Sequence, residues 1–429
     1  MIQTGLIPNA HNDLVTDASY DFYGLRLATC SLDQRIKLWQ LDETNGGWAL
    51  EDDWKAHDAA VSKVSWAHPE FGTIIASSSF DRTVKVWEQT SGIGLPDSQQ
   101  VNGHASQSQT PGPSTSRWIE RAVLPEARGT VRAVEFAPHH FGLKLASISS
   151  DNHLRIYECL EQPSLTTWQL SEEADVQALP QSPSTSPFTR AQQTNALATP
   201  TQTSSSIDGA SAPLIAQALQ QGLQQSSSAL PRPGLGNREA DGGWCISWCK
   251  DRYWGEIIAA GSGTTGVIKI IQLSSNRPTT ILTLDPSPAV EGALVDQDLG
   301  EPSTSAITSV SWAPSCGRSY HLIATGGRDG HVRIWRVKPG EEADDDMADV
   351  EDGRWTASIV ADFEQHKSAV GRVEWNITGT VLSSAGNDGR IRLWKATSGN
   401  VWRPAGSIGV EQSEDHDDER RPDRDIDME

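Results

Sequence analysis

The stretch ASSSFDRTVKVW, residues 76–87, combines three features that together decide the fold. Small residues come first, then Asp81 at a tight turn, then apolar and basic residues that alternate up to a tryptophan. Alternation with a period of two is typical of a β-strand, and a short turn between two such runs indicates a hairpin. The stretch therefore predicts two antiparallel strands joined near Asp81.

The same pattern recurs along the chain, so it is a structural repeat and not an isolated hairpin. A further strand of similar character precedes the copies, as in VSKVSWAHP (61–69) and ITSVSWAPS (307–315). Short strands repeated in this way predict one blade of a β-propeller per copy. The other copies are ATCSLDQRIKLW (28–39), ASISSDNHLRIY (146–157), the degenerate AAGSGTTGVIKII (259–271), ATGGRDGHVRIW (324–335) and SSAGNDGRIRLW (383–394).

Six copies predict an all-β fold, a six-bladed WD40 β-propeller that spans residues 1–409. We expect the blades to end near positions 39, 87, 157, 270, 335 and 394. The abundance of tryptophan, with 16 residues, fits a β-rich fold better than a helical one.

Three copies carry a histidine 22 to 24 residues before the turn aspartate. A catalytic pair would need only one such spacing, whereas a repeated spacing indicates architecture. The copies resemble WD repeats, which implies a buried hydrogen-bond network of His, Asp, a hydroxyl group and Trp in each blade. The residues expected in this blade network are His11, Asp33, Trp39, His57, Asp81, Trp87, Asp151, Asp329, Trp335, His366, Asp388 and Trp394.

The apolar segment Ile2–Ile7 raises the question of whether the ring closes on itself. Blade six already has a candidate outer strand near 401–408, so a leading strand has no blade to complete. The more economical interpretation is an open propeller with free strand edges, which invite a β-element from another chain. The residues expected to contact that partner are Ile2, Leu6 and Ile7. A self-closed ring is the alternative.

The net charge of −21 is concentrated in two segments. Residues 341–353 hold eight acids and no base, and residues 411–429 hold ten acids against three arginines. We expect an acidic loop at 339–353 and an acidic disordered tail at 410–429. Residues 171–240 are rich in Ser, Gln and Pro and are expected to be a disordered insertion. Acidity of this kind argues against direct nucleic-acid binding, which needs a basic surface.

The sequence contains no constellation that predicts catalysis, a cofactor or a metal. The five cysteines are scattered, and the one close pair, Cys245 and Cys249, lies on an alternating strand where the two positions are roughly 13 Å apart. GSGTTG (261–266) lacks the Lys-Ser/Thr pair of a nucleotide-binding loop and stands where other repeats have their turn. No apolar run reaches the roughly 18 residues that membrane insertion requires, and no secretory signal is recognisable, so we expect an intracellular protein.

Several stretches outside the repeat pattern resemble the Seh-type nucleoporin family. The similarity runs over residues 10–165 and 240–403. The motifs that carry it are WAHPEFG (66–72), SFDRTVKVWE (79–88), FAPHHFGLKLAS (136–147), WAPSCGRSYHLIA (312–324) and WNITGTVLSSAGNDGRIRLWKA (375–396).

This resemblance implies a non-catalytic scaffold subunit of the Y-shaped complex of the nuclear pore, with an open six-bladed propeller. The implied partner is an α-solenoid nucleoporin that supplies the missing blade. It also implies membership of a SEA-type complex at the vacuolar or lysosomal membrane surface, which acts in TOR signalling. The alternatives are a COPII-like vesicle-coat subunit or another WD40 adaptor, which would keep the fold and change the partner. A propeller enzyme is a third class, and no acidic or metal-ligating cluster in the sequence favours it.

Overall fold

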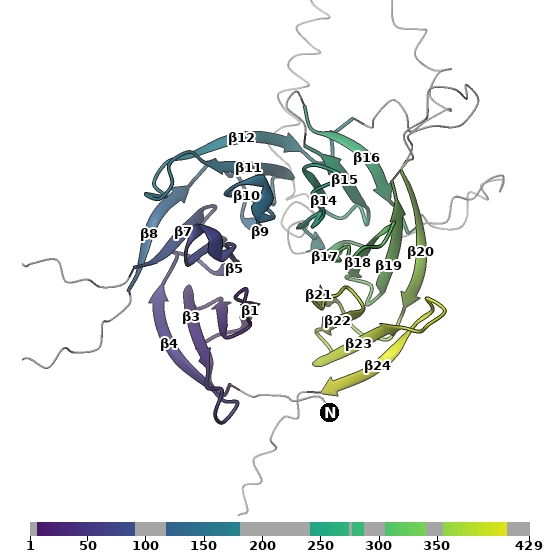
Figure 1. The fold of residues 1–429 in the computed structure, drawn as a ribbon, viewed down its shortest axis with the longest axis horizontal. Coiled ribbons are helices and arrows are strands. Elements are labelled where there is room, and N and C mark those ends of the chain that lie inside the picture. The colour runs from purple at the N-terminus through teal and green to yellow at the C-terminus, as the bar shows by residue number, and fades with distance from the viewer. Residues whose placement is uncertain are drawn as a thin grey trace, which may run out of the picture.

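Six four-stranded antiparallel sheets surround a central axis in the computed structural model (Figure 1). In every sheet the strands follow one another in chain order, from the inner strand beside the axis to the outer strand at the rim. The structure describes residues 7–90, 117–180, 241–273, 277–286, 305–339 and 355–409. The predicted all-β, six-bladed propeller is confirmed.

The first three blades contain twelve strands and two short 3₁₀ helices. Blade one consists of β1 (Val15–Tyr20), β2 (Arg26–Ser31), β3 (Arg35–Leu41) and β4 (Trp48–Lys55). Blade two consists of β5 (Val61–Trp66), β6 (Ile74–Ser79), β7 (Val84–Thr90) and β8 (Arg117–Leu124), with η1 (Pro69–Phe71) after its inner strand. Blade three consists of β9 (Val131–Phe136), β10 (Lys144–Ser149), β11 (His153–Cys159) and β12 (Trp168–Asp175), with η2 (His139–Phe141) in the same place.

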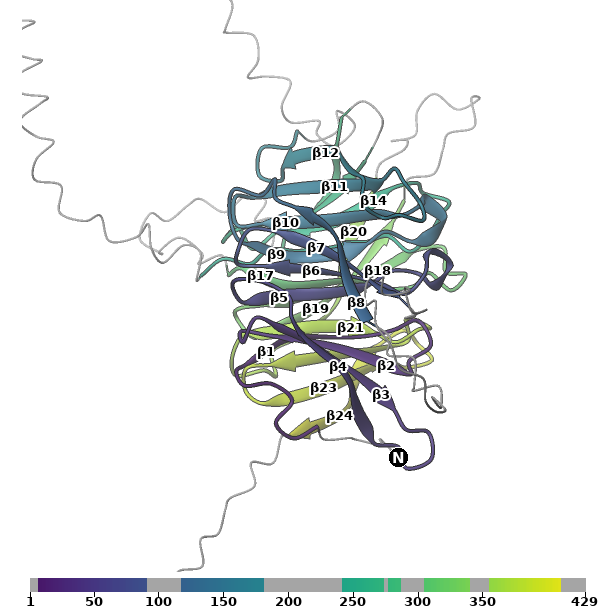
Figure 2. The same ribbon diagram turned by 90° about the vertical axis from the view of Figure 1, so that its left-hand side faces the viewer.

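The last three blades repeat the arrangement and bring blade six beside blade one (Figures 1 and 2). Blade four consists of β13 (Cys245–Trp248), β14 (Ile257–Gly261), β15 (Ile268–Gln272) and β16 (Thr279–Leu284). Blade five consists of β17 (Ile307–Trp312), β18 (His321–Gly327), β19 (Val332–Lys338) and β20 (Thr356–Phe363). Blade six consists of β21 (Val370–Trp375), β22 (Val381–Gly386), β23 (Arg390–Ala396) and β24 (Trp402–Gly409).

Two boundaries differ from the sequence-based expectation. The aromatic positions expected to end the blades lie in the third strands, and a fourth strand completes each sheet. Strand β12 extends to Asp175, so residues 171–175 belong to blade three and not to the Ser/Gln-rich insertion. The polar composition of β12 is compatible with a strand because it is an outer strand, where Glu173 pairs with Arg155 of β11. The rest of the expected insertion from 181, the acidic loop from 340 and the tail from 410 lie outside the described residues.

The turn between the second and third strands explains why aspartate recurs. In five blades the Asp carboxylate accepts the backbone N–H two residues later, as between Asp81 and Thr83 at 2.9 Å. The residue after this aspartate has a positive φ angle in the same five blades, for example 71° at Arg82 and 70° at Gly389. An Asx turn with a left-handed residue is thus built into five of the six repeats and fixes the register of the hairpin.

Apolar residues on both faces of the sheets form the core between neighbouring blades. In blade two, Val84 and Val86 pack toward blade three, whereas Ile75 and Trp87 pack toward blade one. Because each sheet lies between two others, its strands need apolar side chains on both faces. The remaining core clusters join blades three and four, four and five, and five and six.

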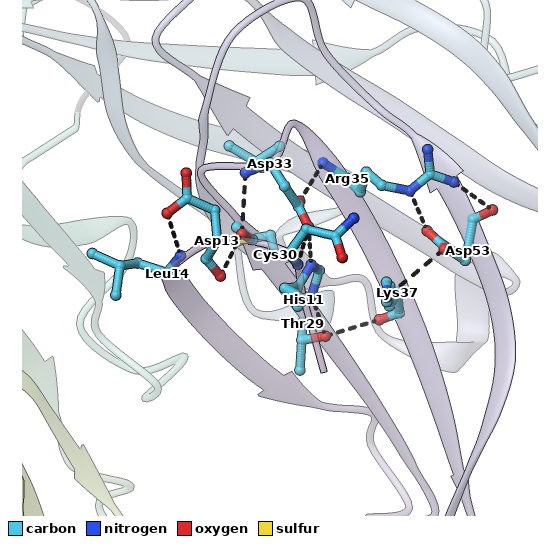
Figure 3. A network of polar contacts seen from close by, with 12 residues as sticks. His11, Asp13, Leu14, Thr29, Cys30, Asp33, Arg35, Lys37 and Asp53 are labelled. Atoms are coloured by element: carbon cyan, nitrogen blue, oxygen red, sulfur yellow. Dashed lines mark hydrogen bonds and ion pairs between the residues drawn. The ribbon is translucent and has the colours of Figure 1, made fainter. Parts of the chain in front are cut away.

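A polar network pins the third strand in three blades. In blade one, His11 contacts the Asp33 carboxylate at 3.0 Å and the Thr29 hydroxyl at 2.9 Å (Figure 3). The Trp39 indole N–H donates to the same hydroxyl at 2.9 Å. The equivalent sets are His57, Ser77, Asp81 and Trp87 in blade two and His366, Ser384, Asp388 and Trp394 in blade six.

Electrostatics keep the turn aspartate of this network ionised. Burial of Asp81 favours its neutral form, but hydrogen bonds from His57 and Thr83 outweigh this and hold the pKa of the carboxyl well below its usual range. The imidazole between carboxylate and hydroxyl is itself buried. A buried network in which each polar group has a partner stabilises a single arrangement of the strands.

The other three blades modify the network. In blade three, the guanidinium of the buried Arg155 binds Asp151 at 2.8 Å and Ser149 at 2.7 Å. Blade five retains the Trp335 bond to Thr325 at 3.0 Å, and its Asp329 pairs with Arg333 at 3.0 Å. In blade four, Ile271 occupies the tryptophan position. Asp151 and Asp329 therefore bind arginine alone, whereas Asp33 and Asp81 bind histidine and Asp388 binds both.

His321 is a buried imidazole at the junction of blades four and five. It is 3% exposed, stacks on Trp355 with ring centroids 5.9 Å apart, and contacts the edges of Trp254 and Trp312. Neither ring nitrogen has a hydrogen-bond partner among the residues that the structure describes. Burial lowers the pKa of His321 to about 4, so the ring is neutral in the folded protein near neutral pH.

Removal of the blade-two network should lower stability. We expect His57→Ala and Trp87→Ala each to reduce the free energy of unfolding by about 2–5 kcal/mol, through unpaired buried groups and lost aromatic packing. Urea denaturation of purified protein measures this. His68→Ala is the control, since its imidazole lies outside the network and is partly exposed. Equal midpoints for all three variants would contradict the structural role of the network.

His321 should make the fold sensitive to acid. Its pKa is lower in the folded chain than the value near 6.5 of an unfolded histidine, so the unfolded state binds the proton more tightly. The stability that neutral His321 supports is therefore present above pH 6.5 and is lost as pH falls toward 4. Between pH 7 and pH 5 we expect a loss of about 2 kcal/mol that His321→Phe does not show. A loss of the same size in His321→Phe would contradict this assignment.

Candidate functional site

The inner strand of blade one has an exposed face. In other blades the same face of the inner strand is buried against the preceding blade. Four other inner strands begin with an aliphatic residue that is at most 4% exposed, namely Val61, Val131, Ile307 and Val370. Val15, which begins β1, is 49% exposed. At the other end of β1, Tyr20 is 56% exposed, whereas its counterparts Trp312 and Trp375 are buried. This face of blade one therefore stays largely exposed along β1, and the Tyr20 ring contacts Trp48 of the same blade.

Blade six shows the complementary exposure on the face toward blade one. Ile391 of β23 is 41% exposed. The residues at the same place in the other blades are at most 1% exposed: Ile36, Val84, Leu154, Ile268 and Val332. We call the surface formed by Val15, Tyr20 and Ile391 the seam. It separates blades one and six, which are adjacent in the ring (Figure 1).

Hydrogen bonds distinguish this junction from the other five in the same way. At each of those five, a backbone N–H of one inner strand donates to a side chain of the preceding inner strand. The bonds run from Val64 to Asp17 (3.2 Å), Phe136 to Ser65 (3.1 Å), Trp248 to Glu135 (3.2 Å), Trp312 to Ser247 (3.0 Å) and Val373 to Ser309 (3.1 Å).

At the seam, the polar contact between described residues of the two inner strands is made by one arginine. Arg372 of β21 pairs with the Asp17 carboxylate and donates to the carbonyl of Ala18 at 2.6 Å. Thr16 and Ser62 elsewhere carry a hydroxyl that reaches the next blade at 2.6 Å, and Gly371 stands at that position in blade six. Blades one and six are therefore bridged near the axis, whereas their apolar faces farther out stay exposed.

The residues predicted for a partner contact only partly fall within the described chain. Ile2 and Leu6 lie outside the described residues, and Ile7 is half-buried ahead of blade one. Sequence reasoning missed Val15, Tyr20 and Ile391. Their residue types match those of buried counterparts, so nothing local distinguishes them. Gly371 could have been identified from the sequence. Alignment of the repeats places it where Thr16, Ser62 and Thr308 carry a hydroxyl group, which glycine lacks.

Across the described ranges, no group of three or more His, Cys, Asp or Glu residues is placed to hold a metal ion. Cys245 and Cys249 are buried in blade four, and burial raises the pKa of each thiol to about 12. Both remain protonated near neutral pH. No helix in the part of the chain that the structure describes is long and apolar enough to cross a membrane.

Comparison with known proteins agrees with the repeat architecture. The model of the family described as WD domain, G-beta repeat, matches residues 4–40, 49–88, 297–336 and 357–395. Each of these ranges ends within the third strand of a blade, namely blade one, two, five or six. Blades three and four, which the match omits, have Tyr157 and Ile271 at the position where the other four blades have tryptophan.

Curated relatives match nearly the whole chain. Nucleoporin SEH1 of Saccharomyces cerevisiae is 32% identical and covers 94% of this chain and 99% of its own length. Nucleoporin seh1 of Schizosaccharomyces pombe is 30% identical, with 96% and 98% covered. Nucleoporin SEH1 of Homo sapiens is 31% identical, with 93% and 86% covered. Identity at this level over whole propellers shows that the chain belongs to the SEH1 nucleoporin family.

Proposed function

We propose that this chain is a non-catalytic scaffold subunit of the nuclear pore complex that binds its principal partner through the seam. The observation that carries the proposal is the matched exposure of Val15 and Ile391, whose counterparts in other blades are buried. Membership of the SEH1 nucleoporin family supports the nuclear pore as the site of action. The proposed assembly is the Y-shaped subcomplex.

The geometry of the seam favours a β-element as the part of the partner that binds. Both walls are faces of twisted sheets, and every other such face in the ring packs on another sheet. A further blade from a partner chain would cover both walls with the same type of packing. We therefore propose that an α-solenoid nucleoporin contributes strands that stack between blades one and six. Ile2, Leu6 and Ile7 remain candidates for pairing with those strands.

A second proposed assembly would use the same surface. We propose that the chain also joins a SEA-type complex at the vacuolar or lysosomal surface that acts in TOR signalling, as its resemblance to the family implies. One seam accommodates one added blade, so membership of the two complexes is mutually exclusive for a single molecule. This exclusivity distinguishes the proposal from the alternative hypothesis of a general WD40 adaptor, which would have several independent binding surfaces.

A charged residue in the seam should abolish partner binding without unfolding the protein. Ile391→Asp places a carboxylate on a face that is already 41% exposed, so we expect the free energy of unfolding to change by less than about 1 kcal/mol. Val84→Asp, at the equivalent buried position of blade two, should cost more than about 3 kcal/mol. Urea denaturation compares the two variants. Affinity purification of tagged Ile391→Asp from cells should then recover less than a tenth of the α-solenoid nucleoporin bound by the wild type.

The two measurements test different parts of the proposal. Severe destabilisation by Ile391→Asp would show that the ring closes on itself in solution and would overturn the open seam. A stable Ile391→Asp that retains the α-solenoid partner would place the binding surface elsewhere. Ile377→Asp is the matched control for purification, because Ile377 is a highly exposed isoleucine of blade six outside the seam.

A further inference from the structure

Two cations stand directly opposite each other near the connection between β23 and β24 of blade six. Lys395 pairs with Arg403 in the ladder, and both side chains are exposed. Of the six described sheets, only blade six has two cations at this rung, which follows the position of Trp394. We call Lys395 and Arg403 the cationic rung. The equivalent pairs are Gln40 with Ala49, Glu88 with Ile119, Glu158 with Gln169, Gln272 with Thr279, and Arg336 with Ser358.

Strand alternation places the cationic rung on the face of blade six that lines the seam. Ile391 occupies the place of Val84, which packs toward the following blade. Side chains separated by an even number of residues on a strand share a face, so Lys395 points the same way as Ile391, roughly 13 Å along the strand. Arg336, at the same rung of blade five, likewise lines a cavity together with Trp402 of the following blade. The cationic rung therefore faces the place where a blade after blade six would stand.

The described residues near this end of the seam supply no carboxylate to the cationic rung. Glu374, the acid of blade six at the same end, pairs with Arg372. On the wall of blade one, Tyr20 and Trp48 lie at this end, with ring centroids 5.8 Å apart. Asp42, which follows the third strand of blade one, is bonded within its own turn. Like charges directly opposite each other in a ladder repel, so the rung costs stability until an acid lies against it.

Charged side chains at the same end of complete junctions pair with the neighbouring blade. Lys144 of blade three binds Glu256 of blade four at 2.6 Å. Lys250 of blade four binds Glu135 of blade three. In both cases the carboxylate comes from the adjacent sheet. At the seam, the adjacent sheet would be the one that a partner inserts.

We propose that the β-element inserted in the seam carries an acidic residue that pairs with the cationic rung. This inference rests on the proposed binding of a β-element in the seam, and it adds the chemistry of the strand that faces blade six. That strand has an apolar residue against Ile391 and a Glu or Asp four positions farther along the same face, roughly 13 Å away. Arg403 binds such a carboxylate through two parallel hydrogen bonds, and Lys395 adds a second charge. Because the apolar and charged contacts lie at opposite ends of β23, together they fix the direction in which the inserted strand runs.

The test uses the full chain, tagged and expressed in cells, and measures the α-solenoid nucleoporin recovered with it. Lys395→Gln/Arg403→Gln should reduce that recovery about 5- to 20-fold, and Lys395→Glu/Arg403→Glu should reduce it further. Lys367→Gln/Arg390→Gln is the matched control. It removes the same charge from the other end of blade six and should change recovery less than about twofold. The urea midpoint of the free Lys395→Gln/Arg403→Gln protein should equal or exceed that of the wild type, because repulsion across the ladder is removed.

Salt dependence and rescue separate a direct ion pair from a structural effect of the substitutions. Between about 0.1 M and about 0.5 M NaCl, recovery with the wild type should fall more steeply than recovery with Lys395→Gln/Arg403→Gln. Each Glu and Asp of the inserted strands is then replaced by Lys, one at a time. One of these replacements should restore binding to Lys395→Glu/Arg403→Glu. If none restores it, the proposed pairing is wrong.

Ile391→Asp distinguishes failure of this inference from failure of the proposed function. If Ile391→Asp loses the nucleoporin and Lys395→Glu/Arg403→Glu retains it, the β-element occupies the seam without using the cationic rung, and only this inference is overturned. If both variants retain the nucleoporin, the seam is not the binding surface, and both proposals are overturned.

Two further outcomes would also overturn the pairing. Equal loss of the nucleoporin in Lys367→Gln/Arg390→Gln would show general charge attraction only. The acids of residues 341–353 are the alternative source of a carboxylate within the chain. If replacing them by their amides removes the salt dependence as fully as Lys395→Gln/Arg403→Gln does, the carboxylate belongs to this chain and not to the partner.

Discussion

Packing of one sheet against the next is the interaction on which the rest of the structure depends. Each blade is a four-stranded meander with apolar residues on both faces, so an isolated blade would expose two hydrophobic surfaces. In blade two, Val84 packs toward one neighbour and Ile75 toward the other. Stability therefore comes from junctions, and six blades in a row make five of them. One apolar face of blade one and one apolar face of blade six therefore have no partner sheet within the ring.

This dependence explains why the polar network tolerates replacement. Blade four lacks both the turn aspartate and the tryptophan, yet its sheet is intact and its strands are buried on both faces. Blade three substitutes a buried ion pair between Arg155 and Asp151. The hydrogen bonds fix the register and position of the third strand, whereas burial against neighbours supplies most of the free energy. A blade can thus lose its repeat signature and keep its place in the ring.

The same distinction sets the limit of sequence-based prediction. The propeller and its third strands were readable because each repeat contains its own turn, with Asp81 and Arg82 as one example. The seam could not be predicted from Val15 or Ile391. The solvent exposure of these two side chains depends on the number of blades in the ring and not on their residue type. The start of the insertion was placed too early at 171 because a polar outer strand resembles a linker in composition.

The contact that bridges blades one and six is an ion pair, and it is compatible with the insertion of a further blade between them. Arg372 and Asp17 form an ion pair beside the axis, where the side chains of Arg372 and Asp17 are 28% and 5% exposed. Burial of two charges offsets much of their attraction, so such a pair specifies geometry more than it adds stability. It holds the inner strands at a fixed spacing while the outer faces stay apart. An added blade would then cover apolar surface that is already exposed, without first breaking a packed hydrophobic contact.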